Sequence, residues 1–265
     1  MSENGNPPAG RRPVAYKNLE FLESTEGRGI RILSEYLHPL AHFRDEKIQD
    51  TIVFFGSARV QEQGPLARYY EEARQLAKSV TEWSEGLGEN SRRFVVCTGG
   101  GPGIMEAANR GASDAGGKTI GLNIGLPFEQ FPNPYITPGL SFEFHYFFMR
   151  KFWLAYPARA LVVFPGGFGT LDEMFELLTL MQTQKIENKV VLVLYGTEYW
   201  RKVLNFDALI EYGTISPEDV HLFHEADDPA TALRILQEKL TEYYLQPEQP
   251  LPEAEATPAL AKSRI

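Results

Sequence analysis

Short runs of consecutive apolar residues alternate along the chain with longer stretches in which apolar residues recur every three or four positions. The short runs are typical of strands covered on both faces, and the longer stretches are typical of amphipathic helices. We expect strands at 51–55, 93–98, 118–124, 160–164, 190–195 and 221–225. We expect helices at 66–83, 103–115, 145–156, 169–183, 198–211 and 230–244, and an extra helix at 27–43 before the first strand. This alternation predicts an α/β fold with a doubly wound parallel sheet.

Both ends of the chain differ in composition from the part between them. Three of the 18 prolines lie within residues 1–13 and four within residues 247–258, where Pro, Glu, Gln and Ala follow one another without apolar periodicity. Such a composition favours disorder. We therefore expect disordered tails at 1–26 and 246–265, on either side of a single domain at 27–245.

The charge balance limits the possible partners. The chain of 265 residues has 26 Lys and Arg against 35 Asp and Glu, which gives a net charge of −9. Because there is no basic field, we expect neither a nucleic acid polymer nor a membrane as a partner, and small anions can bind only at local sites. No apolar run reaches the length of about 18 residues that a membrane-spanning helix needs, and the first residues lack the pattern of a secretory signal. We expect a cytoplasmic protein, in which the single Cys97 excludes internal disulfides and Cys-rich metal sites.

The loops that follow strands are the first candidates for a binding site, because ligands of open parallel sheets bind beyond the carboxyl ends of the strands. The loop after the first expected strand begins with Gly56 and Ser57, which offer close backbone approach and a hydroxyl for a phosphate oxygen. A Gly-Ser turn is common, however, so this pair alone is weak evidence of a site.

The loop after the second expected strand has four glycines in the five positions 99–103 and leads directly into a helix. So many glycines are costly in chain entropy, whereas a tight turn alone needs one or two. They indicate that something approaches the backbone there, and the free amides at the start of the helix favour a phosphate. The spacing is not that of the dinucleotide fingerprint, because Glu106 stands at the third glycine position, and it is not a P-loop.

A second glycine motif follows the fourth expected strand. Gly166, Gly167 and Gly169 precede a helix and offer another set of backbone amides, to which Thr170 adds a hydroxyl. Glu173 falls in the first turn of that helix. A carboxylate at a helix N-terminus is explained equally well by the helix dipole.

A cation on an apolar helix face favours the functional explanation of Glu173 over the helix-dipole explanation. Arg150 has aromatic or apolar residues at i−4, i−3, i+3 and i+4. Its guanidinium must reach water or meet an anion, because an unpaired buried charge is costly. Glu173, a ligand phosphate, or both would satisfy it, and Lys151 poses the same question less sharply.

The segments 99–106, 149–151 and 165–173 together resemble the Lonely Guy (LOG) family of nucleoside-monophosphate phosphoribohydrolases. The element PGGxGTxxE at 165–173 is highly specific to that group, and the resemblance covers about residues 50–225. It implies a Rossmann-like fold, a homodimer or higher assembly, and no metal or cofactor. The implied activity is hydrolysis of the N-glycosidic bond of adenine-type nucleoside 5′-monophosphates, such as AMP or a cytokinin riboside monophosphate, to free base and ribose 5-phosphate.

The resemblance places the catalytic pair on Arg150 and Glu173. We expect Glu173 to stabilise the oxocarbenium-like sugar or to orient the attacking water, and Arg150 to hold Glu173 and lower its pKa. The residues expected to bind substrate and phosphate are Gly56, Ser57, Thr98, Gly99, Gly100, Gly101, Glu106, Asn123, Lys151, Gly166, Gly167, Gly169 and Thr170.

Alternative functions stay open from the sequence. A non-catalytic carrier of a nucleotide or of the molybdenum cofactor would need the anion site but not the pair of Arg150 and Glu173. A salvage enzyme acting on other purine or pyrimidine monophosphates would have the same residues. Members of the family have also carried the label lysine decarboxylase, but the chain has no signature of a lysine that would hold pyridoxal phosphate. The Pro-rich stretch 126–139 is expected to form a stiff wall or lid beside the ligand.

Overall fold

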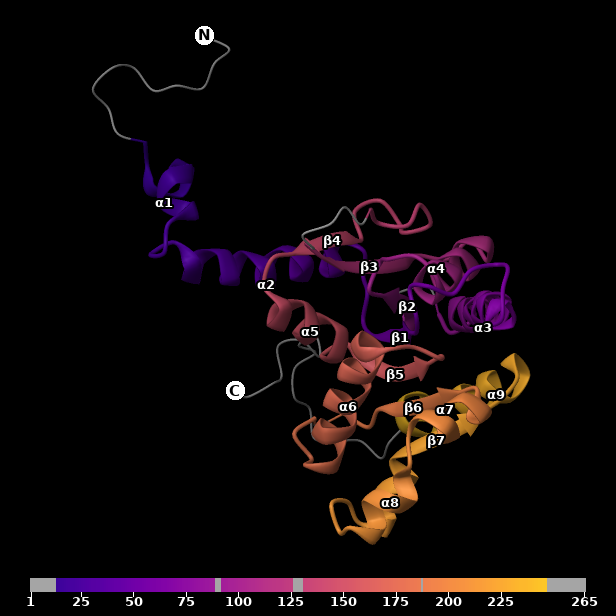
Figure 1. The fold of residues 1–265 in the computed structure, drawn as a ribbon. Coiled ribbons are helices and arrows are strands. Elements are labelled where there is room, and N and C mark those ends of the chain that lie inside the picture. Colours follow the sequence, from indigo (N-terminus) through magenta and orange to yellow (C-terminus); the bar gives the residue numbers. More distant parts are fainter. Residues whose placement is uncertain (1–12, 89–91, 126–130, 187, 247–265) are drawn as a thin grey trace.

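The structure, a computed structural model, describes residues 13–88, 92–125, 131–186 and 188–246. Within these residues, a seven-stranded parallel sheet forms the centre of the molecule (Figure 1). The strands lie in the order β4 (Ser141–Phe144), β3 (Thr119–Ile124), β2 (Val95–Thr98), β1 (Thr51–Phe55), β5 (Ala158–Val163), β6 (Val191–Tyr195) and β7 (Phe223–Ala226). The chain moves from β1 to one edge through β2, β3 and β4, and then crosses to the other side of β1 at β5. The expected α/β fold with a Rossmann-like, doubly wound parallel sheet is therefore confirmed.

Helices cover both faces of this sheet. One face carries α2 (Arg28–Asp45), α5 (Phe147–Ala155), α6 (Phe168–Gln182) and α7 (Thr197–Val203), and the other carries α3 (Ala67–Glu85), α4 (Ile104–Asp114) and α9 (Pro229–Leu240). In β1, Val53 and Phe55 point to the first set of helices, whereas Ile52 and Phe54 point to the second, and all four are buried. Because the strands are buried on both faces, their apolar residues follow one another instead of alternating.

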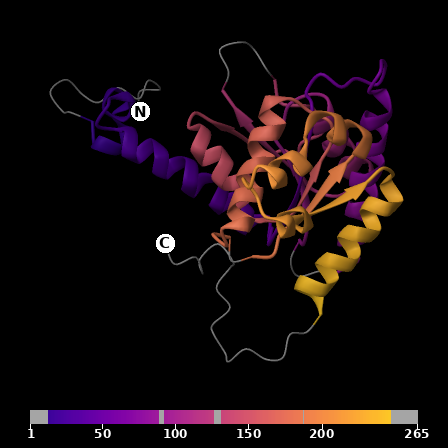
Figure 2. The ribbon, with the colours of Figure 1, turned by 60° about the horizontal axis from the view of Figure 1, so that its bottom comes forward.

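Shorter segments connect these elements. They are the 3-10 turns η1 (Ala15–Lys17) and η2 (Pro217–Leu222), the helices α1 (Leu19–Glu23) and α8 (Phe206–Glu211), and the π-type turn η3 (Thr241–Leu245). In Figures 1 and 2, α1 and the first part of α2 (indigo) extend away from the sheet. Among the helices that the structure describes, none is long and apolar enough to cross a membrane.

The structure differs from the sequence-based expectation in two elements of the domain. The edge strand β4 was not expected, because only Phe142 and Phe144 of its four residues are buried and so short an alternation gives little signal. The helix expected at 198–211 is divided into α7 and α8. The backbone at Leu204 is extended, and the Asn205 side chain accepts a hydrogen bond from the backbone N–H of Ala208 at 3.0 Å, which starts a new helix.

The structure also differs over part of the expected N-terminal tail. Within residues 13–26, η1 and α1 are helical. Asn18 caps α1 by accepting a hydrogen bond from the backbone N–H of Phe21 at 3.3 Å, and the Arg31 guanidinium donates to the carbonyls of Leu22 and Ser24. The rest of the two expected tails, 1–12 and 247–265, lies outside the described residues, as do residues 126–130 of the Pro-rich stretch.

A proline inside α2 links this helix to α5. Pro39 cannot donate a backbone hydrogen bond to the carbonyl of Glu35, and the indole N–H of Trp153 on α5 donates to that carbonyl instead, at 3.0 Å. The Glu35 carboxylate accepts hydrogen bonds from the backbone N–H groups of His145 at 2.8 Å and Tyr146 at 3.2 Å. These two residues lie just before α5, so the Glu35 side chain satisfies amides at the start of that helix.

Candidate active site

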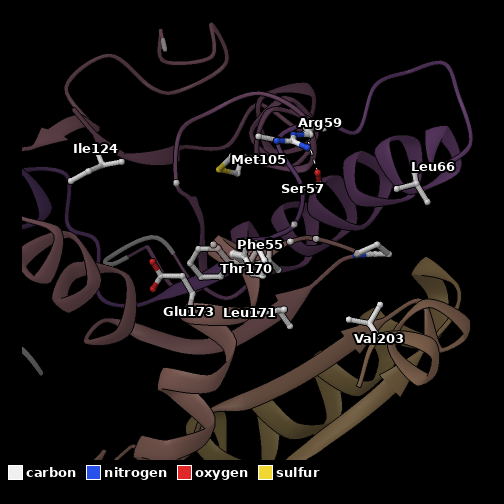
Figure 3. A pocket seen from close by; sticks show the side chains of 18 of the residues that line it. Phe55, Ser57, Arg59, Leu66, Met105, Ile124, Thr170, Leu171, Glu173 and Val203 are labelled. Carbon is white, nitrogen blue, oxygen red and sulfur yellow. Dashed lines mark hydrogen bonds between the residues drawn. The ribbon is translucent and has the colours of Figure 1, made fainter. Parts of the chain in front are cut away.

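A cavity of about 840 Å³ opens beyond the carboxyl ends of β1 and β5, where the strand order of the sheet reverses (Figure 3). This is the position at which open α/β sheets bind ligands. Ten of the residues expected to form the site line the cavity: Gly56, Ser57, Gly99, Asn123, Arg150, Gly166, Gly167, Gly169, Thr170 and Glu173.

The loop after β1 lies between the two glycine motifs. The backbone N–H of Ser57 donates to the carbonyl of Pro165, at 3.0 Å, and the Ser57 carbonyl accepts from the backbone N–H of Ile104, at 3.2 Å. Residues 56–57 are therefore hydrogen-bonded to the start of one motif and to the end of the other. This arrangement brings three loops that are far apart in the sequence to one wall of the cavity.

The second glycine motif, which we expect to serve as an anion cradle, lies at the start of α6. No side chain caps this helix in the described part of the chain, so its first amides stay available to a ligand. A Cβ atom at Gly166 would collide with the Thr170 side chain, which explains the glycine at this position. The Tyr199 hydroxyl donates to the Gly166 carbonyl at 2.9 Å and holds the loop from α7.

In the first glycine motif, the groups that approach the backbone belong in part to the protein itself. A Cβ atom at Gly99 would lie 2.8 Å from Nη2 of Arg150 and 2.9 Å from Sδ of Met105. Gly100 has a φ of +75°, and a Cβ atom there would collide with the side chain of Asn123. The glycines thus make room for the side chains that line the cavity, in addition to any ligand.

Three of the expected site residues, Thr98, Gly100 and Gly101, do not line the cavity, because they belong to a buried polar network. The Asn133 side-chain amide donates to the carbonyls of Gly100 and Gly101, both at 3.1 Å, and to Oδ1 of Asn109 at 2.8 Å. The Thr98 hydroxyl donates to the same Oδ1 at 2.7 Å and accepts from the backbone N–H of Gly100 at 2.9 Å. These contacts fix the shape of the loop before any ligand is bound.

Replacing Gly100 by Ala is expected to destabilise the fold, because the added Cβ atom would collide with the side chain of Asn123. The matched control is Gly116→Ala, because Gly116 has a φ of +76° but no heavy atom within 4 Å of an added Cβ. Both variants lose about 1–2 kcal/mol from the left-handed backbone, and Gly100→Ala loses a further ~1–3 kcal/mol from overpacking against Asn123. Urea unfolding of the two variants measures the difference, and equal losses would contradict it.

Arg150 and Glu173 face each other inside the cavity. Nη1 of Arg150 lies 3.6 Å from Oε1 of Glu173, and the two side chains are only 11% and 6% exposed. Nε of Arg150 donates to the Leu122 carbonyl at 2.9 Å, and the guanidinium lies 5.5 Å from the centre of the Phe147 ring. The two charged groups therefore lie next to each other, as predicted. Because their separation of 3.6 Å is longer than a hydrogen bond, donors of Arg150 stay free for a ligand.

Burial decides the protonation of this pair. Burial raises the pKa of Glu173 to about 7, from an ordinary value of 4.5, although Arg150 acts to lower it. Arg150 therefore acts on the pKa of Glu173 in the expected direction, but the loss of hydration outweighs this attraction and the net pKa is raised. Burial also lowers the pKa of Arg150, against the effect of Glu173, but a guanidinium stays protonated at neutral pH.

Lys151 and Glu106, two further expected binding residues, lie outside the cavity lining. Nζ of Lys151 is held between Asp172, at 2.9 Å, and Glu176, at 3.0 Å. Burial lowers the pKa of Lys151, but the hydrogen bonds to these carboxylates outweigh burial and leave the pKa raised. Glu106 accepts a hydrogen bond from the Tyr70 hydroxyl at 3.0 Å. Lys151 thus joins α5 to α6, and Glu106 joins α4 to α3.

Several residues that shape the site were not recognised from the sequence. Arg59 and Met105 line the cavity, Asn133 holds the first glycine motif, and Tyr199 holds the second. Arg59 lies two residues after Ser57 of the Gly-Ser turn, and Asn133 stands between two prolines, so both had a local signal. Tyr199 had none, because its contact is with a residue 33 positions earlier.

No group of three or more His, Cys, Asp and Glu residues that could hold a metal ion occurs among the residues with a described position.

Comparison with known proteins gives consistent relatives. A family model described as a possible lysine decarboxylase matches residues 105–236. A probable cytokinin riboside 5′-monophosphate phosphoribohydrolase of Oryza sativa subsp. japonica is 29% identical over 211 residues, covering 76% of this chain and 87% of the relative. A protein of the same description from Arabidopsis thaliana is 30% identical over 205 residues, covering 77% of this chain and 92% of the relative. The X-ray structure of TM1055 is 20% identical and covers 71% of this chain and 99% of that one at a TM-score of 0.50, a similarity of fold.

Proposed function

Because the chain belongs to the Lonely Guy (LOG) family, we propose that it hydrolyses the N-glycosidic bond of nucleoside 5′-monophosphates to free base and ribose 5-phosphate. The observation that carries this proposal is the position of one buried carboxylate, Glu173, beside a buried cation, Arg150, in a cavity that also contains an anion cradle. A monophosphate held by its phosphate at residues 166–170 would present its ribose to Glu173, which is three residues further along α6.

The reaction needs a group that supports positive charge on the sugar and accepts a proton. Water adds to C1′, the bond from C1′ to the base nitrogen breaks, and its electron pair leaves with the base, which takes up a proton. A Glu173 side chain with a pKa of about 7 is partly ionised at neutral pH. It therefore accepts the proton of the attacking water and stabilises the oxocarbenium-like sugar, while Arg150 orients the carboxylate.

Side chains next to Arg150 form the wall proposed for the base. Asn123, Ile124 and Phe147 line the same cavity, and Ile124 lies at the end where Glu173 is found (Figure 3). An apolar wall with one amide suits an adenine-type ring, which has both a π-face and hydrogen-bonding edges. AMP and N6-substituted AMP, the class that includes cytokinin riboside monophosphates, are the proposed substrates.

The described lining of the cavity contains no lysine. A decarboxylase that uses pyridoxal phosphate needs a lysine to hold the cofactor as a Schiff base. The description of the matching family model therefore does not enter the proposal.

The proposal includes a homo-oligomer and a cytoplasmic location. Two large aromatic side chains of the cavity lining are exposed, Phe147 at 47% and Phe168 at 93%, and Phe148, next to Phe147 on α5, is 49% exposed. Exposed aromatic groups near a site favour contact with another subunit, and a second copy of the chain is the simplest partner. The cytoplasmic location is supported by the unpaired, buried Cys97.

The proposed activity predicts release of free base from AMP. Purified protein is incubated with AMP, GMP, CMP and N6-isopentenyl AMP, and base and sugar phosphate are separated by chromatography. We expect base and ribose 5-phosphate in equal amounts, with the adenine-type substrates fastest, because the lining suits that ring. Binding of these nucleotides without release would overturn the proposal and would favour a carrier.

A further inference from the structure

The charged residues that line the cavity differ in whether they have an ion-pair partner. Among the described lining residues, the charged ones are Arg59, Arg150 and Glu173. Arg150 is buried, lies next to Glu173 and donates to the Leu122 carbonyl. Arg59 is exposed and forms no ion pair with any residue that the structure describes. Arg59 is therefore the cation of the described lining that has no carboxylate partner.

The backbone fixes Arg59 at the junction of the two glycine motifs. The backbone N–H of Arg59 donates to Oγ of Ser57 at 3.1 Å, which closes a short turn directly after β1. Ser57 is itself hydrogen-bonded to Pro165 and Ile104, so the turn is attached to the loop before α6 and to the first residue of α4. Figure 3 shows Ser57 and Arg59 across the cavity from Glu173, with Thr170 between them in this view.

A dianionic ligand needs such a cation. The protein carries a net charge of −9, so a nucleotide gains nothing from the overall field and depends on local groups. The first amides of α6 supply neutral donors, and Arg150 is opposed by Glu173. Arg59 is the group left to balance a phosphate, and a guanidinium matches phosphate oxygens through paired N–H donors.

We propose that Arg59 binds the 5′-phosphate of the substrate and sets the preference of the site for phosphorylated over unphosphorylated ribosides. This inference rests on the proposed function for the identity of the ligand. It assigns Arg59 to specificity and not to the chemical step, because Arg59 and Glu173 lie on opposite sides of the cavity.

Binding of the product separates this inference from catalysis. Calorimetric titration with ribose 5-phosphate is made for the wild type, Arg59→Ala, Arg59→Lys and Arg44→Ala. Arg44 is the matched control, because it is also exposed and lies on α2, outside the cavity lining. We expect Arg59→Ala to bind ribose 5-phosphate about ten- to hundred-fold more weakly than the wild type and Arg59→Lys to recover part of the loss. Arg44→Ala should match the wild type, and adenine alone should bind all four proteins equally.

Kinetics supply a second readout. With AMP as substrate, Arg59→Ala should raise KM by a similar factor and leave kcat close to that of the wild type, since the contact is the same in the ground and transition states. Equal affinity of Arg59→Ala and the wild type for ribose 5-phosphate, or no binding by the wild type, would overturn the inference. If ribose 5-phosphate binds through Arg59 but no nucleotide is cleaved, the proposed function fails and the phosphate contact stands.

Discussion

Replacing Glu173 by Gln is expected to lower kcat for base release by about 10²–10⁴-fold, the range attributed to a single positioned proton acceptor. The substitution keeps the shape of the side chain but removes its negative charge and its ability to accept a proton. We expect a modest fall in the melting temperature, because Arg150 loses its counter-ion at 3.6 Å, while the cost of a buried carboxylate is removed and the Gln amide oxygen can still accept a hydrogen bond from Arg150. Chromatographic assay of base release, with thermal unfolding by circular dichroism, measures both quantities.

Glu176→Gln is the matched control for this variant. Glu176 lies on the same helix, one turn further on, pairs with Lys151 at 3.0 Å and is outside the cavity lining. It should keep most of the wild-type kcat. Wild-type turnover by Glu173→Gln, or an equal loss in both variants, would contradict the assignment of Glu173.

Replacing Arg150 by Met is expected to lower kcat/KM by about 10²–10³-fold and to change its pH dependence. Arg150 acts to lower the pKa of Glu173, which burial nevertheless raises to about 7. In the wild type, kcat/KM should therefore rise with pH through about 7 as Glu173 loses its proton. Without the neighbouring cation the pKa of Glu173 rises further, so the ascending limb of the variant should move to higher pH.

Arg150→Lys separates charge from shape in this experiment. Lysine keeps the positive charge but not the planar guanidinium that reaches the Leu122 carbonyl. The ascending limb of its kcat/KM profile against pH should lie closer to that of the wild type than the limb of Arg150→Met does, although kcat/KM itself falls. The measurement is kcat/KM against pH for the three proteins, and an unchanged limb in Arg150→Met would show that Arg150 does not act on Glu173.

Most of the framework of this protein could be predicted from local sequence patterns. Strands buried on both faces leave runs of apolar residues, so six of the strands could be placed to within about two residues at each end. The meeting of Arg150 with Glu173 could also be anticipated, because a cation on an apolar helix face requires an anion.

The features that could not be predicted depend on packing between distant parts of the chain. The pKa of Glu173 is set by how deeply the cavity excludes water, and no residue near Glu173 in the sequence reports that depth. The same holds for Asn133, whose amide reaches back to a loop about 30 residues earlier, and for Lys151, which turns away from the cavity to reach Asp172. The residue types showed that Asn133 and Lys151 would need polar partners, but which residues become their partners depends on the fold.

The attachment of α2 to α5 determines how far the chain can be shortened without disturbing the site. The motifs shared with the family, at 99–106, 149–151 and 165–173, all follow α2, yet the carboxylate of Glu35 on α2 accepts hydrogen bonds from the amides of His145 and Tyr146. A chain trimmed to the shared portion would leave those amides, just before the helix that bears Arg150, and the Trp153 indole on the same helix without their acceptors. We therefore expect α2 to hold α5, the helix of the proposed catalytic Arg150, in position, and comparisons of activity between this protein and shorter relatives should keep α2 in place.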